Sequence, residues 1–133
     1  MTKGRLYASV QLVGDRDIAV ARKRVSQAMD GLKARTIRKT RFVTAVSEIA
    51  RNAVMHGGGG SIAIYITERP AAITVVCIDR GPGIADVDAA LGDGFSTANS
   101  MGRGLGGARR LVDRFEIDTA VGQGTTVTMA SAA

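Results

Sequence analysis

Two polar residues interrupt the apolar face of one predicted helix, in the stretch VSEIARNAVMHGGGG at residues 46–60. Glu48 and Asn52 are four residues apart, so in a helix they lie on the same face. A carboxylate can accept a proton from a nucleophile, and an amide oxygen is a hard ligand for a small divalent cation. The pair could therefore serve one reaction, although two solvated residues of an amphipathic helix would give the same pattern.

A third polar residue ends an apolar, β-branched run. The run AITVVCID, residues 72–79, predicts a buried central strand that ends at Asp79. Gly81 and Gly83 follow on either side of a proline, and this pattern predicts a tight turn whose backbone another molecule can approach closely. Asp79 would face that molecule, or it could simply be the polar residue with which a turn begins.

Glycine recurs in two later segments. In SMGRGLGGARRLVDRF, residues 100–115, three alternate glycines precede a predicted helix that has Leu111 and Val112 on its apolar side. A glycine-rich loop that leads into a helix offers unpaired backbone N–H groups, which suit phosphate. The second segment, GQGTTVTM at residues 122–129, predicts a turn into a strand. A glycine triplet alone more often marks a flexible loop, so the interpretation depends on these segments occurring together.

The surrounding pattern alternates helices and strands throughout the chain. Period-two alternation and apolar runs predict strands, and apolar residues at helical spacing predict helices. The predicted strands cover residues 5–13, 61–67, 72–79, 114–119 and 122–129. The predicted helices run from Asp15 or Asp17, as N-cap, to about Gly31, from Ile37 or Thr40 to His56, and after Gly106. A short polar and alanine tail is expected at the end.

Composition limits the class of protein. The chain has 133 residues, of which 45% are hydrophobic, and this predicts a single domain over residues 1–133. The single cysteine, Cys77, cannot form an internal disulfide and is expected to be a small core residue. Without an apolar leader or a long apolar span, the sequence predicts a soluble, cytoplasmic protein with no membrane association.

The charge of the chain leaves the type of partner open. The net charge of +6 could favour nucleic acid, an acidic protein surface or a polyphosphate. Four basic residues cluster at the start of the second helix, where a solvated face is the first interpretation and an acidic partner surface the second. They are Arg35, Arg38, Lys39 and Arg41. His56 ends the same helix, where it suits the dipole better than it suits a metal.

Taken together, four of these segments resemble, in order and spacing, the nucleotide-binding boxes of the Bergerat-fold ATPases. This superfamily, GHKL, contains gyrase, heat-shock chaperones, histidine kinases and mismatch-repair proteins. EIARN is similar to its N box, DRGPG to its Asp-x-Gly-x-Gly box, GRGLG to its second glycine box, and GQGTT to its last box. The resemblance covers roughly residues 40 to 130. The NAVMHG and LGDGFST stretches most resemble the branch of bacterial anti-sigma factors and RsbT-type switch serine/threonine kinases.

This resemblance implies a fold and two ligands. The implied fold class is α/β, an α+β two-layer sandwich with a mixed, mostly antiparallel sheet and the helices on one face. ATP and Mg2+ would lie between the helix layer and a lid from about Asp86 to Gly104.

The resemblance also implies a role for each polar residue. Asn52 would help coordinate Mg2+, and Glu48 would act as the general base for attack on the γ-phosphate. Asp79 would accept a hydrogen bond from the adenine amine, and this contact selects adenine over guanine.

The glycine boxes receive supporting roles. Gly81 and Gly83 would let the backbone pass beside the base, and the Thr125 hydroxyl would support the adenine pocket. The GRGLG box would cradle the phosphates as the lid folds over, and we infer that the arginine within it adds charge there. These box residues are Gly102, Arg103, Gly104, Leu105 and Gly106.

The implied function is a protein serine/threonine kinase of a partner-switching pathway that controls sigma factors or stress responses. Its substrate would be a STAS-domain, anti-anti-sigma-like protein, and a sigma factor or a phosphatase is a further candidate partner. The alternative is an ATP-binding anti-sigma factor or switch that sequesters or activates a partner. Nucleic acid ranks last, because the chain has only two Tyr, three Phe and no Trp to stack on bases. The sequence leaves a homodimer open.

Overall fold

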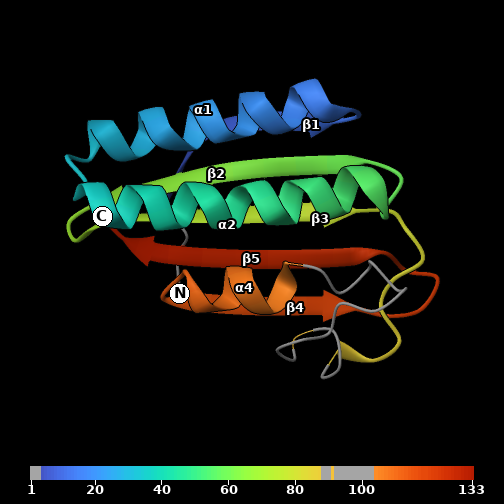
Figure 1. The fold of residues 1–133 in the computed structure, drawn as a ribbon. Coiled ribbons are helices and arrows are strands. Elements are labelled where there is room, and N and C mark those ends of the chain that lie inside the picture. Colours follow the sequence, from blue (N-terminus) through green and yellow to red (C-terminus); the bar gives the residue numbers. More distant parts are fainter. Residues whose placement is uncertain (1–3, 88–90, 92–103) are drawn as a thin grey trace.

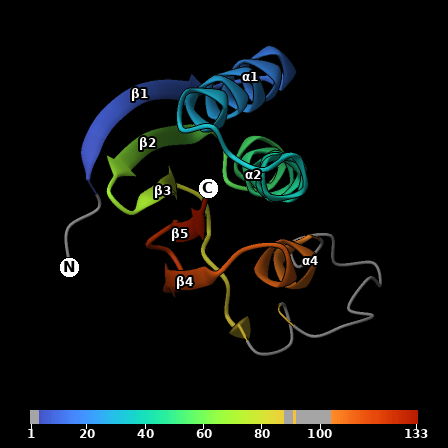
Figure 2. The same cartoon turned by 90° about the vertical axis from the view of Figure 1, so that its left-hand side faces the viewer.

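The computed structural model describes residues 4–87, 91 and 104–133. One five-stranded sheet is covered by helices on a single face (Figures 1 and 2). The strands are β1 (Arg5–Leu12), β2 (Gly60–Glu68), β3 (Ala71–Asp79), β4 (Arg114–Thr119) and β5 (Thr125–Ala132). The helices are α1 (Asp15–Gly31), α2 (Thr36–Met55) and α4 (Leu105–Arg110). The predicted two-layer arrangement is confirmed.

The sheet has the strand order β1-β2-β3-β5-β4, and each neighbouring pair is antiparallel. The resemblance implies a mixed, mostly antiparallel sheet, and within the described residues all four pairings are antiparallel. Residues of β3 and β5 alternate between buried and half-exposed positions, because successive side chains point to opposite faces. The buried positions face the helices.

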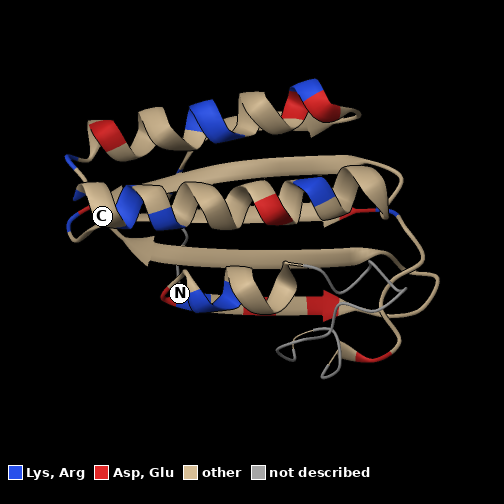
Figure 3. Cartoon of the chain, viewed as in Figure 1, with Lys and Arg blue, Asp and Glu red and all other residues tan. Residues whose placement is uncertain are grey.

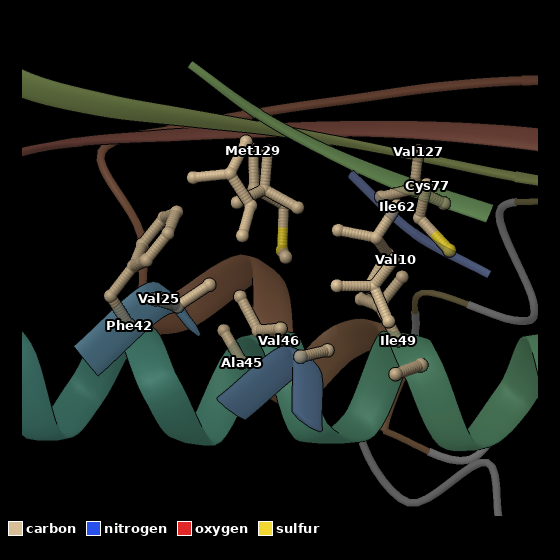
Figure 4. Close-up of a cluster of buried hydrophobic side chains, with 14 of the residues drawn as sticks. Val10, Val25, Phe42, Ala45, Val46, Ile49, Ile62, Cys77, Val127 and Met129 are labelled. Atoms are coloured by element: carbon tan, nitrogen blue, oxygen red, sulfur yellow. The ribbon is translucent and has the colours of Figure 1, made fainter. Parts of the chain in front are cut away.

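The core lies between the helix layer and the inner face of the sheet. Helix α2 contributes Phe42, Ala45, Val46 and Ile49 at helical spacing, and all four are buried (Figure 4). Opposite them, the sheet contributes buried residues such as Ile62, Val127 and Met129. This packing fixes which side of α2 faces the sheet, and it leaves Glu48 and Asn52 half-buried at the border of the core.

Sheet register brings distant box residues together at one end of the molecule. Asp79, the last residue of β3, pairs with Gly60 of β2 on one side and with Thr125 of β5 on the other. The ends of three strands therefore meet at Asp79, and the C-terminal end of α2 packs over the same end (Figure 1).

The start of α1 differs from the prediction. The N-cap is Gly14, not Asp15 or Asp17. Asp17 occupies the third helical position, from which its carboxylate accepts hydrogen bonds from the Val13 N–H at 2.8 Å and the Gly14 N–H at 3.1 Å. Both bonds lower the pKa of the Asp17 carboxyl group, and the bond from Val13 has the larger effect. A carboxylate three residues into a helix can serve the cap as well as one at the cap itself.

The last part of the chain also corrects two expectations. Helix α4 ends at Arg110, so Leu111 and Val112 lie after the helix and pack against the core as half-buried residues. The expected alanine tail is instead part of β5, in which Ser131 pairs with Ile73 and Ala132 with Ala72. In the described part of the chain, no helix is both long and apolar enough to span a bilayer.

Candidate functional site

A small cavity lies where the C-terminal half of α2 meets the ends of β3 and β5 and the first residue of α4. Its volume is about 20 Å³, far below the roughly 300 Å³ or more of a pocket that encloses a small molecule. A cavity of this volume does not enclose a purine. The lining residues are Ile49, Asn52, His56, Gly57, Cys77, Asp79, Ile84, Leu105, Thr125 and Val127.

Glycines surround Asp79 because their missing side chains make room for it. A Cβ atom at Gly57 would lie 2.5 Å from the Asp79 Cγ, and one at Gly124 would lie 2.3 Å from the Asp79 carbonyl oxygen. A Cβ at Gly81 would lie 2.5 Å from the Gly57 Cα. Real Cβ atoms do not approach other atoms this closely, so these three glycines are required by packing around a single aspartate.

The Asp79 carboxylate keeps one oxygen for a ligand. Its Oδ1 accepts a hydrogen bond from the Gly81 N–H at 2.9 Å, which fixes the orientation of the group. Among residues 4–87, 91 and 104–133, none donates a hydrogen bond to Oδ2. A half-buried carboxylate oxygen that accepts no hydrogen bond from the described residues can accept one from an amine of a ligand.

A hydroxyl network holds the loop after β3 against the end of β4 and the start of β5. The Thr119 hydroxyl accepts from the Ile84 N–H at 3.0 Å and donates to the Gly124 carbonyl at 3.0 Å. It also lies 2.8 Å from the Thr125 hydroxyl, which then acts as the donor because Thr119 has only one proton. The buried Thr125 is thus held in place at the cavity wall.

The second part of the site lies on α2. Glu48 Oε1 and Arg51 Nη1 form an ion pair at 3.3 Å, with side chains that are 37% and 47% exposed. A Cβ at Gly104 would lie 2.6 Å from the other oxygen of Glu48, so the start of α4 packs directly on this carboxylate. Gly104 also has a φ of +79°, a conformation that favours glycine. Asn52 lies one turn after Glu48 and lines the cavity.

The structure brings together five predicted residues and separates others. Asn52, Asp79, Leu105 and Thr125 line the cavity, and Gly81 binds Asp79 directly. Glu48 is one helical turn away. Other box glycines support the backbone instead: a Cβ at Gly83 would meet the Ala120 carbonyl, and one at Gly106 would lie 2.5 Å from the Leu91 carbonyl oxygen. Gly102, Arg103 and most of the expected lid from Asp86 to Gly104 lie outside the described residues.

Sequence reasoning missed several lining residues. Gly57 directly follows the predicted helix and carries no signal of its own in the sequence, yet a Cβ atom there would lie 2.5 Å from the Asp79 Cγ. His56 does occupy the C-cap position of α2, as expected, but it also lines the cavity. Only the register of β2 with β3 could have shown that the glycines after α2 face Asp79.

Cys77 is confirmed as a buried core residue, but it lines the cavity as well. Burial, and then the charge of Asp79, raise the pKa of its thiol to about 12. The thiol is therefore neutral near pH 7, and it presents an apolar surface to the cavity rather than a nucleophile.

The family comparison agrees with this geometry. The model of the histidine kinase-like ATPase domain matches residues 15–131, which include α2, the Asp79 turn and the last glycine box. The chain belongs to the histidine kinase-like ATPase family. Family membership implies the use of ATP.

Curated relatives of this kinase-like ATPase are bacterial regulators. The serine/threonine-protein kinase RsbT of Bacillus subtilis (strain 168) is 35% identical over 120 residues, which cover 89% of this chain and 90% of that protein. The anti-sigma F factor of Thermoanaerobacter sp. (strain X514) is 33% identical over 92 residues, 65% of this chain and 64% of that protein. The predicted branch of anti-sigma factors and switch kinases is confirmed.

Solved structures support the fold of this kinase-like ATPase. A chain in the SiaB–SiaC complex from Pseudomonas aeruginosa matches with a TM-score of 0.57 and 11% identity, covering 97% of this chain and 91% of that chain. The histidine kinase domain of the blue-light-activated kinase EL346 from Erythrobacter litoralis matches with a TM-score of 0.51 and 17% identity, covering 95% and 66%. At these identities the likeness is one of fold alone.

Proposed function

We propose that this chain is a cytoplasmic, ATP-dependent protein serine/threonine kinase that phosphorylates a STAS-domain regulator in a partner-switching pathway. The single observation that carries the proposal is that Asp79 and Asn52 line one cavity, and that Glu48 lies one helical turn before Asn52 on α2. Asp79 can hold the adenine base in the cavity, and Glu48 can accept a proton on the other side of Asn52. The similarity to a named serine/threonine-protein kinase over 89% of the chain supports phosphate transfer as that reaction.

Mg2+ fits the residues present. Asn52 offers an amide oxygen at the cavity wall, and a hard oxygen donor of this kind suits Mg2+. Within the described residues, no group of three or more His, Cys, Asp or Glu side chains could hold a metal. Most of the coordination shell would then come from nucleotide phosphates and water, which is the usual arrangement for Mg2+ in phosphoryl-transfer sites. When bound, the ion would neutralise charge on the phosphates.

Glu48 is the proposed general base. As the hydroxyl oxygen of the partner forms its bond to the γ-phosphorus, the bond from that phosphorus to the bridging oxygen of ADP breaks, and the hydroxyl proton moves to Glu48. The Arg51 guanidinium forms an ion pair with Oε1 of this carboxylate at 3.3 Å. The contact of Gly104 with the other oxygen holds the carboxylate at the start of α4.

A transfer assay tests the proposal. The purified chain is incubated with γ-labelled ATP, Mg2+ and each STAS-domain protein encoded near its gene, and the phosphorylated residue is mapped by mass spectrometry. Label on a serine or threonine of one such protein is expected, and it should be absent when Glu48→Gln replaces the wild-type chain. ATP binding without transfer to any of them would refute the kinase assignment.

The anti-sigma relatives support a second candidate. The chain spans 64% of the length of one such relative at 33% identity, so a binding switch that uses ATP to hold a shape is the alternative. The two functions differ in their dependence on Glu48. A binding switch should retain full partner binding and signalling with Glu48→Gln, whereas a kinase should lose its signal.

A further inference from the structure

A second hollow lies at the opposite end of α2 from the nucleotide cavity. It has a volume of about 360 Å³ and is formed by the first turns of α2, the residues after α4 and the end of β5. We refer to it as the arginine groove. Its lining residues are Arg35, Ile37, Arg38, Arg41, Leu111, Val112, Asp113 and Ser131.

The arginine groove is positively charged despite its one acid. Three arginines and one aspartate line it, which leaves a formal charge of +2. Arg38 Nη1 donates to both oxygens of Asp113, at 3.0 and 2.9 Å, and the Ala132 N–H donates to the same carboxylate at 2.8 Å. Asp113 is thereby neutralised and held within the fold. Figure 3 shows the basic residues on the first turns of α2 and on α4.

The arginines still have donors for a ligand. Arg41 uses Nη2 for the Arg110 carbonyl at 3.1 Å, and Arg38 uses Nη1 for Asp113, while a guanidinium has five N–H donors in all. In the described part of the chain, the Arg35 side chain forms no hydrogen bond or ion pair. The charge at this end of α2 is therefore only partly neutralised within the chain.

The groove also has an apolar part. Ile37 is 57% exposed at its rim, and the half-buried Leu111 and Val112 form its floor. A bare phosphate or a nucleic-acid backbone would gain nothing from these apolar side chains. A protein segment that carries carboxylates beside an apolar side chain would satisfy both parts.

We propose that the arginine groove docks an acidic segment of the protein partner, with one apolar side chain seated on Ile37, Leu111 and Val112. This inference rests on the proposed function, because the partner is the protein that the kinase phosphorylates. Arg38 and Glu48 are ten residues apart on α2, which corresponds to about 15 Å along the helix axis. A single small domain can span that distance, so docking at the groove can hold the acceptor hydroxyl near Glu48.

A labelled peptide tests the groove without the partner. The probe is the fluorescein-labelled peptide Gly-Ser-Glu-Glu-Leu-Glu-Glu-Ser-Gly, and the comparison peptide has Gln in place of each Glu. Fluorescence anisotropy at low ionic strength measures the affinity, and NMR shift changes locate the site. The acidic peptide should bind more tightly and should shift the methyl signals of Ile37, Leu111 and Val112.

Matched double variants separate the groove from general surface charge. The groove variant combines Arg35→Glu with Ile37→Asp. The α1 variant combines Arg22→Glu with Val20→Asp, which makes the same change of charge on the exposed side of α1. Acidic residues in the first turn of a helix favour its dipole, so the groove variant should fold. It should bind the acidic peptide roughly tenfold more weakly, because attraction becomes repulsion. The α1 variant should change the affinity less than twofold.

The same proteins distinguish this inference from the nucleotide function. ATP affinity should be equal in the wild-type chain and both variants, and absence of ATP binding in all three would count against the proposed function alone. The groove inference is overturned if the Glu and Gln peptides bind equally, or if the α1 variant loses as much affinity as the groove variant. The inference would also be overturned if inorganic phosphate or duplex DNA displaced the labelled peptide at lower concentrations than the unlabelled acidic peptide does.

Discussion

The two halves of the proposed nucleotide site are built in different ways. Around Asp79, three segments approach so closely that a Cβ at position 57 would meet the Asp79 side chain, and one at position 81 or 124 would meet backbone atoms. Around Glu48, by contrast, two side chains on one exposed helical face form an ion pair, and only Gly104 approaches closely. The region around Asp79, which we call the base side because it would hold the adenine base, depends on tertiary packing. The region around Glu48, which we call the phosphate side, depends mainly on helix geometry. Substitutions should therefore impair binding and stability on the first side and transfer on the second.

The largest effect is expected from Glu48→Gln, on the phosphate side. The amide keeps the shape of Glu48 but cannot accept a proton, so the rate of phosphate transfer should fall by about 10²- to 10⁴-fold. ATP affinity should change only slightly, because Glu48 does not line the cavity. Single-turnover transfer and calorimetry measure the two quantities. Glu116→Gln, at an exposed carboxylate of β4, is the control, and an equal loss there would refute the role of Glu48.

The base side should be closed to thiol reagents. Since the pKa of Cys77 rises from 9.0 to about 12, the thiolate fraction at pH 8 falls about a thousandfold. Alkylation by iodoacetamide should be slower than in the urea-unfolded chain by at least that factor, as mass spectrometry can measure. The raised pKa stabilises the fold fully below pH 9, and this contribution is lost as the pH rises from about 9 toward 12. Equal rates in the folded and unfolded chains would show that the cavity is open.

Asp79→Asn should weaken ATP binding by roughly 10- to 100-fold, the range expected for a hydrogen bond to a charged group worth about 1.5–3 kcal/mol. The Asn oxygen can still accept from the Gly81 N–H, so the fold should persist. The amide nitrogen of the new side chain, however, is a hydrogen-bond donor, and it would face the adenine amine, which is also a donor. Calorimetry with ATP and GTP measures the loss of affinity and of selectivity. Asp118→Asn on β4 should have no effect; a similar loss there, or an unchanged preference for ATP, would contradict the assignment.

The smallest effect concerns stability on the base side. Gly57→Ala places a Cβ 2.5 Å from the Asp79 Cγ, and overpacking of this kind costs about 1–3 kcal/mol in the free energy of unfolding. Gly107→Ala in α4 meets nothing within 4 Å, so its stability should stay the same or rise by up to about 1 kcal/mol. Urea denaturation compares the two variants. If they behave alike, the close packing around Asp79 does not constrain position 57.

The same contrast explains how much could be predicted from the sequence. The face of α2 and the pairing of Glu48 with Asn52 follow from helical periodicity, which is a local property. The end of β3 at Asp79 follows equally from an apolar run bounded by a turn. These local patterns also gave the order and type of most elements.

The rest depends on contacts between distant segments. The closeness of Gly57 to Asp79, and the place of Cys77 in the cavity wall, arise from sheet register and from the packing of α2 over the strand ends. The basic residues at the start of α2 were expected to be a solvated face. In the structure these residues lie at the surface, but Arg38 also pairs with Asp113 and Lys39 with Asp30, and a groove forms because the residues after α4 return to this end of the sheet.

The central claim is that one magnesium-bound ATP spans both halves of the site, and calorimetry of ATP binding with and without Mg2+ tests it most directly. In the wild-type chain we expect one ATP per chain and a clear gain in affinity with Mg2+. Asn52→Ala should keep the Mg2+-free affinity but lose that gain, whereas Asp79→Asn should bind weakly under both conditions. Failure of the wild-type chain to bind ATP at millimolar concentration, or a full Mg2+ effect in Asn52→Ala, would contradict the claim.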